Sequence, residues 1–512
     1  MIAQLALALA ALLVCSAAAP VDDTVPDSAT ILAKVAAATG PPPNAYHETD
    51  EIVYSNGERT IEHDTVRGQS WRYVDDTGPF HTERGFDKGQ AWHQNANGQT
   101  ILDQPDPGLA TQDFTTTTVS RVHAPVEAFV VAKLNAKGYG SKQYVDPTTW
   151  QTIRRERLDP NGIVATTYDD VRLDHGRTFA HHWHVDNGIN QISNDERVTA
   201  YDHDPVTDDQ VAIAPPLRAL VIFPSGVTSV VLPTQFTGGH IIVRVTINGR
   251  GLDFVLDTGA PGIYIDLDVA KQLGLPLYAR ESAVAAGRYT TARTVVPEMH
   301  VGDLLLRNVA LQAVPQGWNE SPDVKTVGLL GFDFLAELGV TLDYLNQKVT
   351  VVPGLDYVPP SDPHTIPLDV RIGTGQPLAS VRLNGALGER WILDTGASGT
   401  FLIFDYFARR YPAALHDDHG LGAQRGPVLH YGIGGSFQAR PFAIANLVLA
   451  GVDFTDVVGY LVTSRGSYDF DGDGVIGAKF LGLFTVGLDY GNSSVYLVPT
   501  AATQRVMRPI VK

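Results

Sequence analysis

Cysteine is nearly absent from the sequence, which has Cys15 as its single cysteine in 512 residues. One cysteine can form neither an internal disulfide nor a structural zinc site, so folding stability must come from packing. Charged residues are also scarce, at 18%, and acidic residues outnumber basic ones by 56 to 38. A net charge of −18 leaves no basic surface of the kind that nucleic acids and anionic membranes require. We therefore expect no nucleic-acid partner.

The long apolar run of the sequence lies at its N-terminus, where residues 2–19 end in small side chains. This pattern is typical of a secretory signal peptide, so residues 1–19 are expected to be cleaved and the protein exported to the periplasm or the medium. Two alternatives stay open, because a basic segment is missing before the run. A lipoprotein signal at Cys15 would need a small residue in place of Val14, and an uncleaved anchor would be short for a full span. No membrane span is expected after cleavage.

Glycine (49) and proline (32) are frequent, which favours turn-rich β structure over helical bundles. Residues 28–39 predict a short helix with Ser28 as its cap. From about residue 45 to 225, short strands alternate with turn dipeptides such as Asn56-Gly57. The sequence therefore predicts an antiparallel β-rich domain over residues 22–225 with one N-terminal helix. Prolines at positions 215, 216 and 224 predict a linker after it.

The rest of the sequence is an internal duplication. Residues 241–274 and 378–411 both predict a strand, an Asn-Gly turn, a strand, Asp-Thr-Gly-Ala, a strand and a short helix. Further on, the spacing between Gly331 and Asp343 equals that between Gly477 and Asp489. Agreement in order and spacing predicts two related lobes, residues 232–354 and 364–500.

Each lobe places an aspartate at the end of an apolar strand, Asp257 in the first and Asp394 in the second. The glycines that follow, Gly259 and Gly396, permit a tight turn that exposes the carboxylate. Each lobe later has two apolar residues followed by glycine, which can pack beneath the Asp loop. These segments are Leu329-Leu330-Gly331 and Val475-Ile476-Gly477.

These paired motifs resemble the pepsin-like and retropepsin-like aspartic proteases over roughly residues 230–500. The resemblance implies a mainly β, two-lobed acid-protease barrel fold that follows the antiparallel sheet domain. It implies catalysis by Asp257 and Asp394. The residues that support this dyad are expected to be Thr258, Gly259, Thr395 and Gly396, because in the family the threonine hydroxyls bond across the lobe interface.

Peptide hydrolysis needs a base and an acid, and two carboxylates about 3 Å apart share one proton and supply both. Water attacks directly, so no covalent intermediate is expected. Ala260 and Ala397 stand where many pepsin-like enzymes have a hydroxyl that bonds the ionised dyad. Its loss should raise the apparent pKa of the dyad, so activity is expected in the weakly acidic to near-neutral range.

A glycine-rich segment of the second lobe resembles the flap tip of retroviral proteases. A flap must bend over substrate and donate backbone hydrogen bonds, which glycine permits. The predicted flap and substrate-binding residues are Gly432, Ile433, Gly434 and Gly435. The first lobe has no equal segment, with Ala286-Gly287-Arg288-Tyr289 a weak candidate. A hairpin that never contacts substrate is the alternative.

Three other motifs are interpreted as structural. Asp76-Thr77-Gly78 repeats the triplet without the downstream segment, so it predicts an ordinary turn. Residues 469–474 resemble the start of a calcium loop, but Phe480 stands where that loop needs glutamate. The cluster His181, His182 and His184 has no acidic partner at useful spacing. No metal and no cofactor are therefore expected.

The N-terminal domain loosely resembles the periplasmic lipoprotein-carrier fold, a curved sheet around an apolar cavity. Segments 144–148 and 168–172 carry this resemblance. The sequence as a whole predicts an exported, monomeric aspartic endopeptidase whose partner is a peptide or protein substrate. The alternative is a non-catalytic envelope protein that binds a lipidic or peptide ligand through residues 22–225, with lobes that have lost activity.

Overall fold

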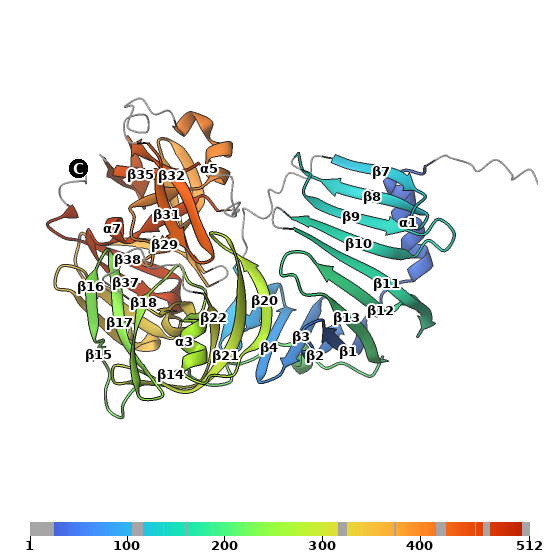
Figure 1. The fold of residues 1–512 in the computed structure, drawn as a ribbon, viewed down its shortest axis with the longest axis horizontal. Coiled ribbons are helices and arrows are strands. Elements are labelled where there is room, and N and C mark those ends of the chain that lie inside the picture. Colours follow the sequence, from blue (N-terminus) through green and yellow to red (C-terminus); the bar gives the residue numbers. More distant parts are fainter. Residues whose placement is uncertain are drawn as a thin grey trace, which may run out of the picture.

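The computed structural model describes residues 25–104, 116–136, 138–159, 162–315, 325–372, 375–415, 426–455, 457–463 and 472–503. The predicted signal peptide and Cys15 lie outside these residues. Within them, no helix is long and apolar enough to cross a membrane. The fold is mainly β, as predicted, with large antiparallel sheets and one N-terminal helix; Figure 1 shows the N-terminal sheet beside two packed lobes.

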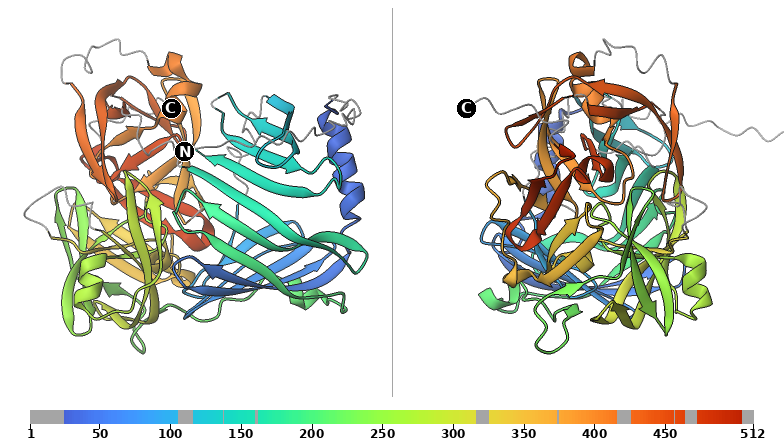
Figure 2. Two further views of the ribbon diagram at one scale, coloured as in Figure 1. Left: turned by 45° about the vertical axis from the view of Figure 1, so that its right-hand side comes forward. Right: turned by 90° about the vertical axis from the view of Figure 1, so that its left-hand side faces the viewer.

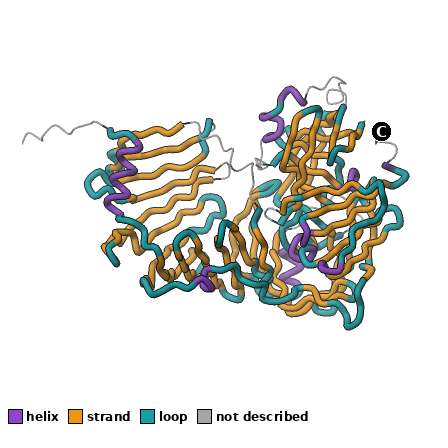
Figure 3. The backbone as a smooth tube through the Cα atoms, turned by 180° about the vertical axis from the view of Figure 1, so that it is seen from behind, coloured by secondary structure: helices purple, strands orange, loops and turns teal. Residues whose placement is uncertain are grey.

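Helix α1 (Ser28–Thr39) is capped by Asp27, whose Oδ1 accepts the backbone N–H of Thr30 at 2.7 Å. The predicted cap, Ser28, is instead the first helical residue. A carboxylate at this end also interacts favourably with the helix dipole, which explains the shift by one position. Figure 2 places α1 at the edge of the sheet far from the lobes, and Figure 3 shows it crossing the strands.

The N-terminal domain is one sheet of thirteen antiparallel strands, in the order β6-β5-β4-β3-β2-β1-β13-β12-β11-β10-β9-β8-β7. Consecutive strands pair through short turns, except β6 and β7, which lie at opposite edges of the sheet. The first and last strands, β1 and β13, pair at its centre. The strands are β1 (Ala45–Tyr54), β2 (Arg59–Arg67), β3 (Ser70–Thr77), β4 (Phe80–Asp87), β5 (Gln90–Gln94), β6 (Thr100–Leu102), β7 (Thr116–Val122), β8 (Ala128–Leu134), β9 (Gly140–Val145), β10 (Thr152–Asp159), β11 (Gly162–Asp174), β12 (Arg177–Asn187) and β13 (Asn194–Asp202).

The face of this sheet that α1 covers is called the inner face here. It is apolar beneath α1, where Ile31 packs against Phe129 and Val131. Residues that pair directly across two neighbouring strands lie on the same face of the sheet. Following these pairs from β8 through β13 to β1 places Glu196 and Asp50 on the inner face. The apolar cavity that the lipoprotein-carrier resemblance implies is therefore replaced by carboxyl groups at its centre.

Lobe 1 is built on a nine-stranded sheet in the order β14-β22-β19-β23-β18-β17-β21-β20, with β16 paired to β17. Its strands are β14 (Val221–Ile222), β16 (Thr234–Thr237), β17 (His240–Ile247), β18 (Arg250–Leu256), β19 (Ile263–Asp266), β20 (Tyr278–Val284), β21 (Arg288–Val301), β22 (Leu304–Val314) and β23 (Gly328–Leu330). Two short helices, α3 (Leu267–Gln272) and α4 (Phe332–Leu335), follow β19 and β23.

Lobe 2 repeats this plan in a ten-stranded sheet, in the order β31-β32-β35-β30-β36-β29-β28-β33-β34, with β27 paired to β28. Its strands are β27 (Arg371–Ile372), β28 (Pro377–Leu383), β29 (Ala386–Asp394), β30 (Phe401–Ile403), β31 (Val428–Gly432), β32 (Gly435–Ile444), β33 (Leu447–Leu449), β34 (Val452–Phe454), β35 (Val457–Val462) and β36 (Gly474–Gly477). Helix α5 (Asp405–Arg410) follows β30, and α7 (Ala478–Leu481) follows β36.

A six-stranded sheet joins the two lobes, in the order β15-β25-β24-β37-β38-β26. Its strands are β15 (Val230–Val231), β24 (Leu338–Asp343), β25 (Lys348–Pro353), β26 (Ile366–Asp369), β37 (Phe484–Asp489) and β38 (Ser494–Pro499). The central pair, β24 and β37, consists of matched segments of the duplication and is antiparallel. One hydrophobic core runs through both lobes, so the two repeats fold against each other.

The segment predicted as a linker is part of the fold. Strand β14 lies within it and pairs with β22 of lobe 1. Short helix α2 (Asp208–Val211) precedes it, and the carbonyl oxygen of Pro215 accepts a hydrogen bond from Gln94 at 3.0 Å. The prolines interrupt regular structure here, but the backbone around them is hydrogen-bonded to the N-terminal domain on one side and to lobe 1 on the other.

Candidate active site

Both Asp loops are built in the same way. In lobe 1, β18 runs into Asp257 and pairs in parallel with β23, while β19 after the loop pairs antiparallel with β23. In lobe 2, β29, β36 and β30 repeat these relations around Asp394. Strand β23 or β36 therefore lies between the strand that enters the loop and the strand that leaves it, which fixes both ends of the loop.

The glycine that ends each apolar segment is required by close backbone contact. A Cβ atom at Gly331 would lie 2.2 Å from the carbonyl oxygen of Ala260, and one at Gly477 would lie 2.4 Å from that of Gly399. The residue directly before each glycine packs into the core of the lobes. Leu330 and Ile476 are fully buried. The motif predicted to support the Asp loops is thus in contact with them.

The two loops are tied together by threonines. Thr258 Oγ1 donates a hydrogen bond to the carbonyl oxygen of Leu393 at 2.6 Å, and Thr395 Oγ1 donates to that of Leu256 at 2.7 Å. Each hydroxyl also accepts the backbone N–H of the other threonine, at 3.1 and 3.0 Å. Both side chains are 1% exposed. Four buried hydrogen bonds therefore cross the lobe interface directly behind the aspartates.

The aspartates face each other across the same interface. A Cβ atom at Gly259 would lie 2.4 Å from Cγ of Asp394, and one at Gly396 would lie 2.4 Å from Cγ of Asp257. Each carboxylate also accepts a backbone N–H from the glycine of its own loop, at 2.9 Å in lobe 1 and 2.8 Å in lobe 2. Glycine is thus the residue that lets the carboxyl groups approach.

Burial raises the pKa of both aspartates. The pKa of Asp257 is raised well above its usual value by burial first and then by the charge of Asp394, to which it is hydrogen-bonded. Burial also raises the pKa of Asp394, against the lowering effect of that hydrogen bond and of the N–H groups of Gly396 and Ala397. Carboxyl groups this close resist ionising together, which favours a single proton shared by the pair.

Two hairpins meet near the dyad. The predicted flap residues lie in the β31–β32 hairpin of lobe 2, whose tip meets the β20–β21 hairpin of lobe 1. The backbone N–H of Ala286 donates to the carbonyl oxygen of Ile433 at 2.9 Å. A Cβ atom at Gly287 would lie 2.2 Å from the carbonyl oxygen of Gly434. The weak candidate of lobe 1, Ala286-Gly287-Arg288-Tyr289, thus lies at the hairpin tip that meets the glycine-rich tip of lobe 2.

A cavity of about 900 Å³ is lined by the dyad, Gly432 and Ile433. Sequence reasoning missed several of its other residues. His240, at the start of β17, lies close enough to Asp394 to lower its pKa. From the N-terminal domain, His93 and Asp103 reach the cavity as a pair, with Nδ1 and Oδ1 2.8 Å apart. No local pattern links these residues to the dyad.

Two buried tyrosines at matched positions of the duplication also adjoin the dyad. Tyr344 follows Asp343, and Tyr490 follows Asp489. Burial raises the pKa of both phenols, and carboxylate charge from the dyad raises it further. The duplication could have identified this pair, because the tyrosines occupy the same place in each copy.

Of the motifs interpreted as structural, the third Asp-Thr-Gly lies in the N-terminal sheet, whereas Gly472 of the other lines the same cavity as the dyad. Asp76-Thr77-Gly78 forms the turn between β3 and β4, and Asp76 pairs with His81 at 2.7 Å. Of residues 469–474, the first three lie outside the described part of the chain. Asp473 is buried and accepts the backbone N–H of Arg390 at 2.9 Å.

The histidine cluster does have acidic partners, contrary to the sequence-based statement. His181 contacts Asp174 at 3.1 Å. His182 contacts Asp169 at 2.5 Å, and His184 contacts Asp195 at 3.2 Å. The partners were missed because they sit on neighbouring strands or at the far end of the β11–β12 hairpin. The three pairs involve three different aspartates.

Comparison with known proteins agrees with this geometry in lobe 1. Residues 243–334 match a family model described as aspartyl protease. An uncharacterized protein in the cobV 5′ region of Sinorhizobium sp. is 27% identical over 127 residues, covering 24% of this chain and 52% of that protein. The chain thus spans about half the length of this curated relative. The matched part of lobe 1 is similar to aspartyl proteases.

Two solved structures are each similar to part of the chain. A LolA superfamily protein from Nitrosomonas europaea is 9% identical, with a TM-score of 0.28, over 37% of this chain and 98% of its own. Basic 7S globulin from soybean is 12% identical, with a TM-score of 0.32, over 54% of this chain and 96% of its own. Similarities with TM-scores this low do not indicate a function.

Proposed function

We propose that this protein is an exported aspartic endopeptidase that hydrolyses peptide bonds with water activated by Asp257 and Asp394. The observation that carries the proposal is the set of hydrogen bonds exchanged by Thr258 and Thr395, which fixes two buried carboxyl groups face to face. The family match over residues 243–334 supports the protease class.

The shared proton divides the chemical roles. The ionised carboxylate takes a proton from water, whose oxygen attacks the carbonyl carbon of the scissile bond. The protonated carboxyl donates to the carbonyl oxygen, so a tetrahedral gem-diol forms without a bond to the enzyme. As this species collapses, one of its hydroxyl protons passes to the ionised carboxylate, the C–N bond breaks, and the leaving amine takes the proton held by the other carboxyl group. The pair is thereby left with one proton between its two carboxyl groups, as at the start.

The substrate would lie extended in the 900 Å³ cavity, beneath the tips of the two hairpins. Backbone groups at Ile433 and Gly434 are placed to bond a peptide once the hairpins part. No cofactor is required, because the dyad supplies both the acid and the base. Export follows from the predicted signal peptide.

The test compares the purified mature chain with Asp257→Asn and Asp394→Asn on a mixed peptide library between about pH 3 and 8. Asp76→Asn is the matched control, because it changes the same triplet in the β3–β4 turn. We expect cleavage by the parent and the control, with an optimum in the weakly acidic to near-neutral range, and none by the dyad variants. Failure of the parent to cleave, or cleavage by either dyad variant at the parental rate, would refute the proposal. An optimum below about pH 3 would refute the predicted range.

The alternative of lipid binding through the N-terminal domain is less favoured by the side chains of its inner face. An acyl chain needs an apolar lining, and burying carboxyl groups beside it is costly. Apolar side chains are concentrated beneath α1, whereas the centre of the face carries Glu48, Asp50 and Glu62. The centre of this face is suited to a cationic ligand.

A further inference from the structure

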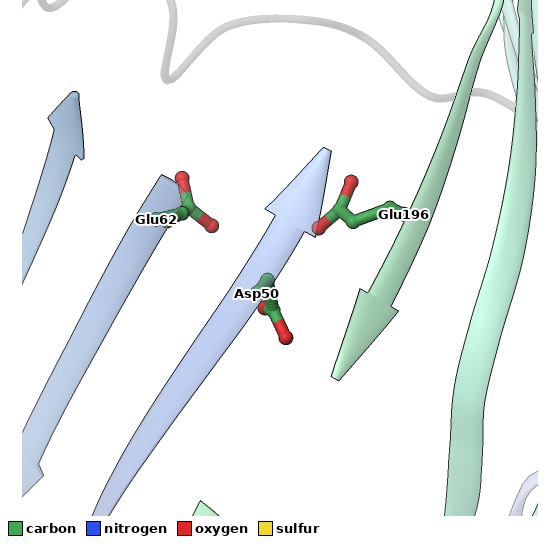
Figure 4. Close-up of side chains that lie close together, drawn as sticks. All are labelled: Asp50, Glu62 and Glu196. Atoms are coloured by element: carbon green, nitrogen blue, oxygen red, sulfur yellow. The ribbon is translucent and has the colours of Figure 1, made fainter. Parts of the chain in front are cut away.

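Three carboxyl groups converge on the inner face of the N-terminal sheet. Asp50 lies on β1, opposite Glu62 on β2. Glu196 on β13 pairs with Ile52, two residues along β1 on the same face. Figure 4 shows the three side chains together, and one oxygen from each lies within 4.8 Å of the others.

Asp50 has a buried oxygen without a partner. The residue is 2% exposed, and its Oδ1 has no hydrogen bond within the described part of the chain. A buried carboxylate oxygen that makes no hydrogen bond is costly, so such an atom is expected to meet a ligand when one is present. The other two groups are already oriented. Glu62 pairs with Arg84 at 2.7 Å, and Glu196 accepts a hydrogen bond from Trp183.

Negative charge exceeds positive charge around the three groups. The carboxyl groups that influence one another here are Glu48, Asp50, Glu62, Asp64, Asp75 and Glu196. Two guanidinium groups, Arg84 and Arg177, oppose them. A divalent cation bound among these carboxyl groups would offset the repulsion between their negative charges.

We propose that Asp50, Glu62 and Glu196 form a binding site for a hard divalent cation, with calcium as the best fit. All three ligands are carboxylate oxygens, which calcium prefers, whereas zinc and copper favour histidine and cysteine. Oxygens on opposite sides of a calcium ion lie about 4.6–5.2 Å apart, so the observed grouping can close around one ion. Waters would complete the coordination from the adjoining cavity of about 410 Å³, which Glu62 and Glu196 line.

The site is independent of the proposed protease activity. No metal was expected from the sequence, because the three residues are distant in the chain and meet only through strand pairing. A larger cation such as a polyamine is a poorer occupant, since Asp50 is almost inaccessible.

The test uses terbium as a luminescent substitute for calcium on the full mature chain at neutral pH. Trp183, hydrogen-bonded to Glu196, is placed to sensitise bound terbium. We expect sensitised luminescence that calcium displaces, and affinity reduced roughly tenfold or more in Asp50→Asn and Glu62→Gln. Glu51→Gln is the matched control, because Glu51 is the next residue of β1 and points to the opposite face. It should bind like the parent.

Thermal unfolding provides a second readout that does not depend on terbium. Calcium should raise the melting temperature of the parent and of Glu51→Gln but not that of the two site variants. The site variants replace carboxyl groups with neutral amides of the same shape, so they should fold without the ion. Equal luminescence in all variants, no calcium-dependent stabilisation of the parent, or stabilisation by spermidine instead of calcium would overturn the proposal.

Discussion

The two lobes share the scaffold that holds the proposed dyad but differ in what surrounds their hairpins. Both hold an aspartate by the same strand relations and the same glycine contacts. In lobe 1, strand β20 lies beside the N-terminal domain (Figure 1) and is bonded to it. The backbone N–H of Ser282 donates to the carbonyl oxygen of Asn190 at 2.7 Å, and Asn190 Nδ2 donates to Glu281 at 3.0 Å. In lobe 2, β31 is an edge strand on which Leu429 is 47% exposed.

The duplication keeps the Asp loops alike in both lobes. The contacts that hold β20 come from the N-terminal domain. Paired substitutions in the Asp loops should have equal effects in the two lobes. Perturbation of the N-terminal domain should affect one hairpin and spare the other.

Among substitutions that leave both aspartates in place, the largest effect is expected from Gly259→Ala and Gly396→Ala. Each would place a methyl group against the carboxyl carbon of the opposite aspartate, so kcat/KM should fall about a hundredfold or more in both. Gly399→Ala is the control, because its Cβ would meet nothing within 4 Å. Peptidase assays that find one glycine variant active would show that the lobes do not contribute equally.

Removing either threonine hydroxyl should destabilise the lobe interface. Thr258→Val and Thr395→Val each lose one donated and one accepted hydrogen bond in a buried site. The free energy of unfolding should fall by about 1–3 kcal/mol in each, as measured by denaturant titration. Serine at the same positions keeps the hydroxyl and should restore most of the loss. A valine variant as stable as the parent would contradict this account.

The dyad should make stability depend on pH. Because folding raises the pKa of Asp257, the folded state binds the proton more tightly than the unfolded state does. Stability is therefore greatest at acidic pH and falls as pH rises above the unfolded value of 3.8 towards the folded pKa. Asp257→Asn carries no charge at this position, so it escapes this loss and should be more stable than the parent at neutral pH.

Melting temperatures measured across the pH range would test this prediction. The advantage of Asp257→Asn should shrink as the pH falls, because the parental dyad then becomes protonated. A variant less stable than the parent at neutral pH would mean that the carboxyl groups are not held together as described.

The smallest effect concerns the hairpins. Asn190→Ala removes a side-chain hydrogen bond to Glu281, so amide exchange in β20 should accelerate about two- to tenfold while that in β31 is unchanged. Asn346→Ala, in an exposed turn of lobe 1, is the control. Hydrogen exchange that accelerates equally in both hairpins would remove the proposed difference between the lobes.

The Asp loops could be predicted from the sequence because their constraints are local and occur twice. Asp257, Thr258 and Gly259 lie within one turn, and the glycine that packs beneath them has the same spacing to a later matched aspartate, Asp343 or Asp489, in each copy. The meeting of the hairpin tips could not be predicted, since backbone at Ala286 recognises backbone at Ile433 without a side-chain signature.

The carboxyl cluster was missed for a different reason. Strand β1 has polar residues on both faces, with Glu48 and Asp50 inward and His47 and Thr49 outward. Alternation therefore gives no sign of which face is buried. Strand pairing across the sheet then decides which carboxyl groups meet, and no local pattern in the sequence indicates that pairing.

The most direct test of the central claim is a kinetic comparison of the parent, Asp257→Asn, Asp394→Asn and the double variant on one peptide that the parent cleaves. Residues that act as a unit are strongly non-additive. We predict that both single variants lose about a thousandfold or more in kcat/KM and that the double variant is no worse than either. A single variant that retains most of the parental kcat/KM, or losses that add in the double variant, would contradict a shared dyad.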